Sequence, residues 1–294
     1  MQTTIPDPKV FGPKCVLGEA PVWDAVSARL SWVDCDRKQM FRLDPESGDV
    51  TAFDLPGHPG SYAFRSDGTV LIAYRTSLAL VDLASGSHQA IETPGIDFAK
   101  ARFNDGACDR AGRFWLGTMH KAMSEPVGAL YRVDPDLSVR QMAEGFVVSN
   151  GIAFSPDDRV MYQTDSRPAV IYAYEFDLAS GAISGRRVFA GFDASKERPD
   201  GCTIDKDGCL WVAMLGGGRV AVLDPDGKEM RSISLPTRRP TSLCFGGPSL
   251  DTLFVTSMTL ALSEEELAAQ PDAGRIFAFE GIGRGLAEPN FGVR

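Results

Sequence analysis

The chain has 294 residues, a length that fits one large domain or two of medium size. Hydrophobic residues make up 44% of it and charged residues 23%, so the chain can bury a core and has no long biased segment typical of disorder. The formal charge of −9 argues against nucleic acids and anionic membranes as partners, because both are themselves negatively charged.

The ends and the cysteines bear on the cellular compartment. Residues 1–8 lack the basic start and apolar run of a signal peptide, and no apolar stretch approaches the roughly 20 residues that span a bilayer. We therefore expect a cytoplasmic protein. The six cysteines contain no CxxC pair, and Cys108, Cys202, Cys209 and Cys244 lie in apolar, strand-like surroundings. This pattern favours free structural cysteines over disulfides or a zinc site.

Two markers alternate strictly along the chain, six of each. The first is a turn followed by a strand with a large apolar residue, and these residues are Trp32, Leu71, Trp115, Tyr162, Trp211 and Phe254. The second is a strand closed by an acidic turn, at 41–48, 80–86, 131–135, 174–181, 222–227 and 276–280, the last without the turn residues. Strand signals bounded by Gly, Pro, Asp and Ser are typical of β-strands joined by tight turns.

The markers recur about every 40 to 50 residues, which leaves room for roughly four strands per repeat. This period predicts an all-β protein, a six-bladed β-propeller with four-stranded blades. We expect residues 1–294 to form a single propeller domain. A β-helix or a pair of sandwiches would not require both markers in strict alternation. Helix is expected only near 262–269, where Ser263 can cap a short turn.

A propeller places equivalent positions of its blades around one axis. Counting back 11 to 13 residues from each blade's large apolar residue, to the loop entering that strand, gives Glu19, Gly60 or its neighbour Ser61, Asn104, Asn150, Asp200 and Thr241. We call these the ring positions, and we expect them to converge at one mouth of the channel. Taken singly, Asn150-Gly151 and Asp200-Gly201 could be ordinary turn dipeptides. Their equivalence across blades instead favours a divalent metal site, because carboxylate and amide oxygens are ligands that hard cations prefer.

Other common sites fit the sequence poorly. His58, His88 and His120 are too dispersed for a histidine-rich zinc site. No GxSxG motif occurs, which argues against a nucleophile elbow with a Ser-His-Asp triad. Gly216–Gly218 is not followed by Gly-Lys-Ser/Thr, so we interpret it as a hairpin turn rather than a phosphate loop.

Six motifs together carry a family resemblance: residues 17–24, 102–106, 117–119, 149–157, 198–201 and 254–257. On these residues the chain resembles the senescence-marker/gluconolactonase/luciferin-regenerating family, which includes regucalcin and bacterial sugar lactonases. The resemblance covers nearly the whole chain. It implies a six-bladed propeller with one divalent ion bound by Glu19, Asn150 and Asp200, and a substrate contacted by Arg102 and Asn104.

One departure from the family pattern concerns the lid over the site. Animal members carry a glutamate shortly after Gly-Thr-Met, whereas this chain continues with His120, Lys121, Ala122, Met123, Ser124 and Glu125. The resemblance therefore does not imply which sugar lactone is used.

The implied reaction is hydrolysis of a sugar lactone to the aldonic acid, in the manner of a gluconolactonase. One divalent ion (calcium, zinc, manganese or magnesium) would polarise the lactone carbonyl or activate water. Asp200 would also orient or deprotonate that water as general base. Arg102 and Asn104 would bond the ring hydroxyls and stabilise the developing oxyanion, although Arg102 could instead form a surface salt bridge.

The expected partner is a small-molecule sugar lactone, with no nucleic acid and no membrane, and the chain is expected to be a monomer or weak homodimer. Two alternatives stay open from the sequence. One is a propeller hydrolase of organophosphates or of other lactones, and the other is a non-enzymatic calcium-binding or interaction propeller.

Overall fold

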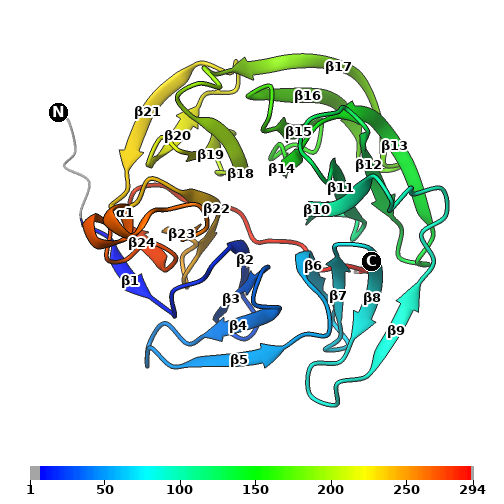
Figure 1. Cartoon of the computed structure of the whole chain (residues 1–294). Helices are drawn as coiled ribbons and strands as arrows, with labels where there is room; N and C mark the ends of the chain where they lie inside the picture. Colours follow the sequence, from blue (N-terminus) through cyan, green and yellow to red (C-terminus); the bar gives the residue numbers. More distant parts are fainter. Residues whose placement is uncertain (1–6, 293–294) are drawn as a thin grey trace.

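Six four-stranded antiparallel sheets surround a central channel in the computed structural model of this chain (Figure 1). The structure describes residues 7–292, so most of the N-terminal segment considered for a signal peptide lies outside the described residues. The arrangement is a six-bladed β-propeller, and the predicted fold is confirmed. Within the described range, the single helix is far too short to cross a membrane.

The first three blades follow one another in chain order, each running from its innermost to its outermost strand. Blade 1 consists of β2 (Gly18–Asp24), β3 (Arg29–Asp34), β4 (Gln39–Leu43) and β5 (Val50–Asp54). Blade 2 consists of β6 (Pro59–Phe64), β7 (Val70–Tyr74), β8 (Ser77–Val81) and β9 (His88–Ile91). Blade 3 consists of β10 (Ala101–Cys108), β11 (Phe114–His120), β12 (Gly128–Val133) and β13 (Val139–Phe146).

The last three blades complete the circle, and the sixth joins the two ends of the chain. Blade 4 consists of β14 (Ser149–Phe154), β15 (Val160–Asp165), β16 (Val170–Asp177) and β17 (Ala182–Gly191). Blade 5 consists of β18 (Arg198–Ile204), β19 (Leu210–Leu215), β20 (Arg219–Leu223) and β21 (Glu229–Ser234). Blade 6 consists of β22 (Pro240–Gly246), β23 (Thr252–Ser257), β24 (Ile276–Glu280) and, as its outermost strand, β1 (Lys9–Phe11). The helix α1 (Glu264–Ala269) lies between β23 and β24, and Ser263 caps it as expected.

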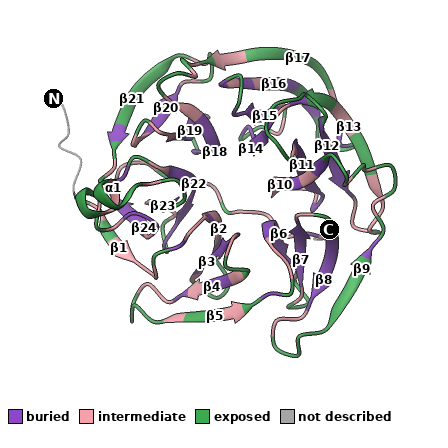
Figure 2. Ribbon diagram, in the orientation of Figure 1, coloured by how far each residue is buried: buried purple, intermediate pink, exposed green. Residues whose placement is uncertain are grey.

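The two sequence markers correspond to the two middle strands of every blade. The large apolar residues of the first marker lie on the second strands, and the second marker forms the third strands. Trp32, Trp115 and Trp211 are fully buried between blades, and truncating any of them to alanine would cost about 3–5 kcal/mol. Burial falls outwards: inner strands such as β14 and β22 are wholly buried, whereas outer strands such as β17 and β21 are mostly exposed (Figure 2).

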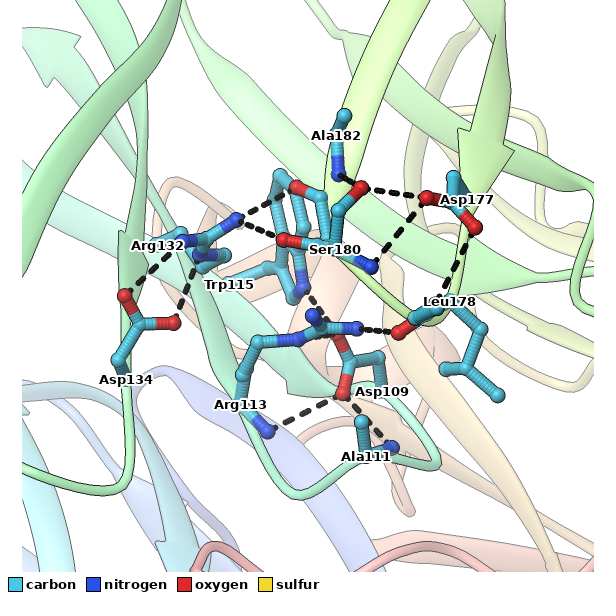
Figure 3. Close-up of polar contacts among 12 residues, drawn as sticks. Asp109, Ala111, Arg113, Trp115, Arg132, Asp134, Asp177, Leu178, Ser180 and Ala182 are labelled. Carbon is cyan, nitrogen blue, oxygen red and sulfur yellow. Dashed lines mark hydrogen bonds and ion pairs between the residues drawn. The ribbon is translucent and has the colours of Figure 1, made fainter.

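A buried polar network ties blade 3 to blade 4 (Figure 3). Asp109 accepts hydrogen bonds from Nε of Arg113 at 2.6 Å and from Nε1 of Trp115 at 2.9 Å. Arg113 and Arg132 then donate to backbone carbonyls of residues 178–181, in the turn between β16 and β17. Each buried cation therefore has several partners, as a charge away from water requires.

The C-terminal segment crosses the far end of the channel. Gly285 bridges to Asp205 in blade 5, and Phe291 bridges to Arg65 in blade 2. Both partners lie where an innermost strand ends, so the segment (red in Figure 1) covers the mouth opposite the one where those strands begin.

Candidate functional site

Every innermost strand is interrupted by a β-bulge at its ring position. The register against the second strand shifts between Glu19/Val22, Pro59/Ser61, Phe103/Gly106, Asn150/Ile152, Pro199/Cys202 and Pro240/Leu243. A bulge bends the strand and re-aims its side chains, and bulges are common next to active sites. The ring residues thus lie inside the innermost strands, near their starts, rather than on an entering loop as predicted from the sequence.

Two glycines next to ring residues are required by close packing between neighbouring inner strands. A Cβ atom on Gly151, whose φ is +34°, would lie 2.5 Å from the carbonyl oxygen of Asp200. A Cβ atom on Gly201 would lie 2.3 Å from Oγ of Ser242. These glycines bring the strands together around the channel, so Asn150-Gly151 and Asp200-Gly201 are not ordinary surface turns. Ala20, directly after Glu19, also has a positive φ of 49°, a strained conformation of the kind that clusters at functional sites.

A chain of hydrogen bonds joins four of the predicted site residues across blades 3, 4 and 5. Nη1 of Arg102 donates to Oδ1 of Asn104 at 3.0 Å, and Nδ2 of Asn104 donates to Oδ1 of Asn150 at 2.5 Å. Nδ2 of Asn150 donates in turn to Oδ1 of Asp200 at 2.5 Å and to Oγ of Ser166 at 2.9 Å. The structure therefore brings together residues from distant parts of the sequence.

Glu19 belongs to blade 1, and its carboxyl group lies near those of Asp200 and Asp105. Burial, followed by the nearby carboxylates Asp200 and Asp105, holds the pKa of Glu19 well above its usual range. Burial and Asp105 likewise hold the pKa of Asp200 well above its usual range, while Arg239 acts in the opposite direction. Burial also raises the pKa of Asp105 to about 6. Three carboxyl groups thus share one poorly solvated region.

This charge distribution fits a divalent cation. None of the three carboxylates forms an ion pair with Lys, Arg or His in residues 7–292, and buried like charges without a partner are costly. Asn150 could add its amide oxygen to those of Glu19 and Asp200. Across the same residues no group of three or more His, Cys, Asp or Glu side chains is arranged to hold a metal ion, so an amide oxygen would have to complete the ligand set. Such a mixed, incomplete ligand set would leave coordination positions for water or substrate.

Arg102 lies half-buried beside the site, and within the described residues it forms no salt bridge. Its hydrogen bonds go to Asn104 and to the carbonyl oxygen of Phe103. Burial and, after it, the nearby guanidinium of Arg75 lower the pKa of Arg102, while Glu19 is among the groups that raise it. The surface salt bridge considered as an alternative for Arg102 is therefore not what the geometry shows.

Two other ring positions do not contribute side chains to this chain of bonds. Oγ1 of Thr241 donates to the carbonyl oxygen of Gly18 at 2.5 Å and so joins blades 6 and 1. The hydroxyl of Ser61 is buried without a hydrogen-bond partner among the described residues. In the loop that differs from the family pattern, Nδ1 of His120 accepts from the backbone N–H of Glu125 at 3.0 Å, and Nζ of Lys121 donates to the carbonyl of Phe98. Both contacts hold the loop in place.

Sequence reasoning missed two carboxyl groups deeper in the channel. Asp105 and Glu288 both line a cavity of about 80 Å³ between the ring residues and the C-terminal segment. Burial raises the pKa of Glu288 to about 7, and nearby Arg110 opposes that shift. Asp105 gave no signal in the sequence, because the bulge that turns it towards the channel is visible only from the pairing with β11. Glu288 lies outside the repeat and offered none.

The sequence is similar to known proteins over most of its length. Residues 17–259 match the SMP-30/Gluconolactonase/LRE-like region. The chain is 39% identical over 277 residues to 6-deoxy-6-sulfogluconolactonase of Pseudomonas putida, covering 94% of this chain and 95% of that protein. It is 35% identical over 285 residues to regucalcin of Homo sapiens, covering 95% of each.

A solved structure extends the match to three dimensions. The calcium-binding protein regucalcin of Agrobacterium tumefaciens aligns with a TM-score of 0.92 at 28% identity, covering 98% of this chain and 97% of that one. The fold and the sequence similarity thus lead to one assignment. The chain belongs to the SMP-30/gluconolactonase/LRE-like family.

Proposed function

We propose that this protein is a metal-dependent lactonase that hydrolyses a sugar lactone to the aldonic acid. The observation that carries the proposal is the hydrogen-bonded chain from Arg102 to Asp200, with the unpaired Glu19 carboxylate beside it. A relative at 39% identity is named as a sulfogluconolactonase, which supports a lactone of a sugar acid as the substrate class.

Glu19, Asn150 and Asp200 would hold one divalent ion through oxygen atoms, and calcium, magnesium, manganese and zinc all accept such ligands. When bound, the ion would supply Lewis-acid polarisation of the lactone carbonyl and a lower pKa for bound water. Its charge would also offset the repulsion that raises the pKa values of Glu19 and Asp200, so both would be ionised at neutral pH.

Asp200 would orient the attacking water and accept its proton as general base, because its Oδ1 is held in place by Asn150 at 2.5 Å. Attack on the carbonyl carbon places negative charge on the carbonyl oxygen. Arg102 and Asn104 are pre-positioned by their mutual bond of 3.0 Å and would donate to that oxygen or to the ring hydroxyls. The ring C–O bond then breaks, and the alkoxide takes up a proton to give the open aldonic acid.

The test is to strip the protein with a chelator and to follow acid release from five- and six-carbon aldonolactones as each divalent ion is added back. We expect hydrolysis that depends on one ion, and its loss in Asp200→Ala and Asn150→Ala proteins that retain the wild-type circular dichroism spectrum. Full activity in either variant would contradict the proposed roles.

A second candidate is a calcium-binding propeller without catalysis, which the name of the Agrobacterium relative favours. Stoichiometric calcium binding without hydrolysis of any lactone in the panel would support it.

A further inference from the structure

Three blades carry an arginine two residues before the ring position. Arg102 precedes Asn104, Arg198 precedes Asp200, and Arg239 precedes Thr241. The hydrogen bond between Arg102 and Asn104 shows that the two side chains lie together in blade 3. The other blades have Leu17, Pro59 and Val148 at this place, so the arginines are confined to blades 3, 5 and 6.

Arg198 and Arg239 have no carboxylate partner in residues 7–292. Neither guanidinium takes part in an ion pair or a side-chain hydrogen bond there, and Nε of each is buried without a hydrogen-bond partner. Their neighbours differ: Arg238 is exposed and donates to Glu266 at 3.3 Å, and Arg219 is paired with Glu197 at 2.6 Å. A buried donor without a partner is unfavourable, so these two arginines are suited to an acceptor supplied by a ligand.

Arg239 directly precedes the inner strand of blade 6, the blade opposite that of Arg102, and Arg198 belongs to blade 5 beside it. Blades 5 and 6 are neighbours, and β22 faces β10 across the channel (Figure 1). Arg239 acts electrostatically on Asp200, whereas Arg102 acts on Glu19. Cations therefore flank the carboxylates from two sides, in a protein whose overall charge is −9. An elongated substrate that places its lactone carbonyl near Arg102 would extend towards Arg198 and Arg239.

We propose that Arg198 and Arg239 bind a sulfonate or phosphate group on the substrate, at the end remote from the lactone carbonyl. This inference rests on the proposed lactonase function and narrows its substrate class to anionic sugar lactones. Guanidinium groups suit both anions, because their planar N–H donors match tetrahedral oxyanions. The competing role for Arg239 is purely electrostatic support of Asp200, which would affect charged and neutral lactones alike.

The test compares kcat/KM for three substrates that differ at one carbon: gluconolactone, its 6-sulfonate and its 6-phosphate. Wild-type protein should prefer one of the anionic lactones over the neutral one by at least about 10-fold. In Arg198→Gln and Arg239→Gln, kcat/KM for the anionic lactone should fall by about 10- to 100-fold more than kcat/KM for the neutral one. The fall should come chiefly from a higher KM, as expected when charge-assisted hydrogen bonds to the substrate are lost. The relative loss for sulfonate and phosphate identifies the preferred anion. Arg198→Lys should recover part of the preference, and Arg238→Gln, the exposed neighbour, should leave it unchanged.

A binding experiment tests this inference independently of the proposed reaction. Titration calorimetry of the ion-loaded protein would compare gluconate with its 6-sulfonate and 6-phosphate, which need no turnover. If no lactone is hydrolysed but an anionic acid binds at least about 10-fold more tightly than gluconate, and Arg198→Gln abolishes that difference, the anion site stands and the lactonase proposal fails. The anion site would be overturned if the wild type hydrolysed neutral gluconolactone with the same kcat/KM as the anionic lactones. It would also be overturned if both variants reduced kcat/KM equally for all three lactones.

Discussion

Replacing Asp200 with asparagine should change the stability of the protein in opposite directions with and without a divalent ion. Asp200 is 5% exposed, and the substitution keeps its shape and an acceptor oxygen for Nδ2 of Asn150. It removes one negative charge from a region shared with Glu19 and Asp105. Without an ion this relieves repulsion and desolvation, whereas with an ion it removes a charged ligand.

The expected changes in the free energy of unfolding follow from proton linkage and from ion binding. A carboxyl group whose folded pKa is raised contributes stability below its unfolded pKa and loses that contribution as pH rises through the folded pKa. At pH 8 the buried carboxyl group of Asp200 therefore no longer makes that contribution to the ion-free protein in full. We expect Asp200→Asn to stabilise the ion-free protein at this pH, because it removes a carboxyl group whose charge is disfavoured by burial and by Asp105. An ion at 100 times its Kd adds about 2.7 kcal/mol to the wild type, and a 100-fold weaker Kd would reduce this to about 0.4 kcal/mol.

Urea unfolding at pH 8, followed by tryptophan fluorescence with chelator and with each ion, measures both effects. Asp226→Asn is the matched control, because Asp226 is an exposed aspartate of the same blade. Its free energy of unfolding should follow the wild type under both conditions. An Asp200→Asn protein that is less stable than wild type in chelator, or that gains as much as wild type from the ion, would refute the charge argument.

Three further changes test other parts of the structure. The pKa of Glu288 is raised to about 7 by burial, so its contribution to stability should fall by about 2 kcal/mol between pH 5.5 and 8, and urea unfolding of Glu288→Gln should lack that fall. Asp109→Asn leaves buried Arg113 without its carboxylate and should cost about 3–5 kcal/mol in urea unfolding. Asp205→Asn is the control: Asp205 also accepts a hydrogen bond from a tryptophan, Trp211, but has no buried arginine beside it among the described residues. This change should therefore lower the free energy of unfolding by less. Arg102→Gln should lower kcat/KM for a lactone by about 100-fold or more while leaving the unfolding midpoint within error.

The fold could be predicted from the sequence because each blade repeats the same local chemistry. A turn that ends in glycine or aspartate and a strand with a large apolar residue recur at one period, and packing between blades buries residues such as Trp115 and Trp211. The outer strand of blade 6 was not predicted. It comes from Lys9–Phe11, paired with β24 more than 260 residues away, and three residues are too few for a strand signal.

The site was predictable only in part. Counting back from the large apolar residues found Glu19, Asn150 and Asp200, because the repeat fixes equivalent backbone positions. It could not find the bulges, since an extra residue in one strand becomes visible only when its partner is known. For the same reason it could not show that Asp105 also turns into the channel, or that Thr241 instead bonds to blade 1.

The bulges explain how six similar blades build a site that differs from one side to the other. Backbone geometry at the ring positions is nearly equivalent, so the chemistry depends on which residue each blade places there and two residues earlier. Blades 1, 4 and 5 supply the oxygen atoms suited to an ion, whereas blades 3, 5 and 6 supply arginines. These two sets overlap only in blade 5, so the mouth is asymmetric: Arg102 belongs to blade 3, and Arg198 and Arg239 belong to the neighbouring blades 5 and 6. If the anion site is present as proposed, a lactone bound beside the ion would lie with its carbonyl towards blade 3 and its anionic group towards blades 5 and 6.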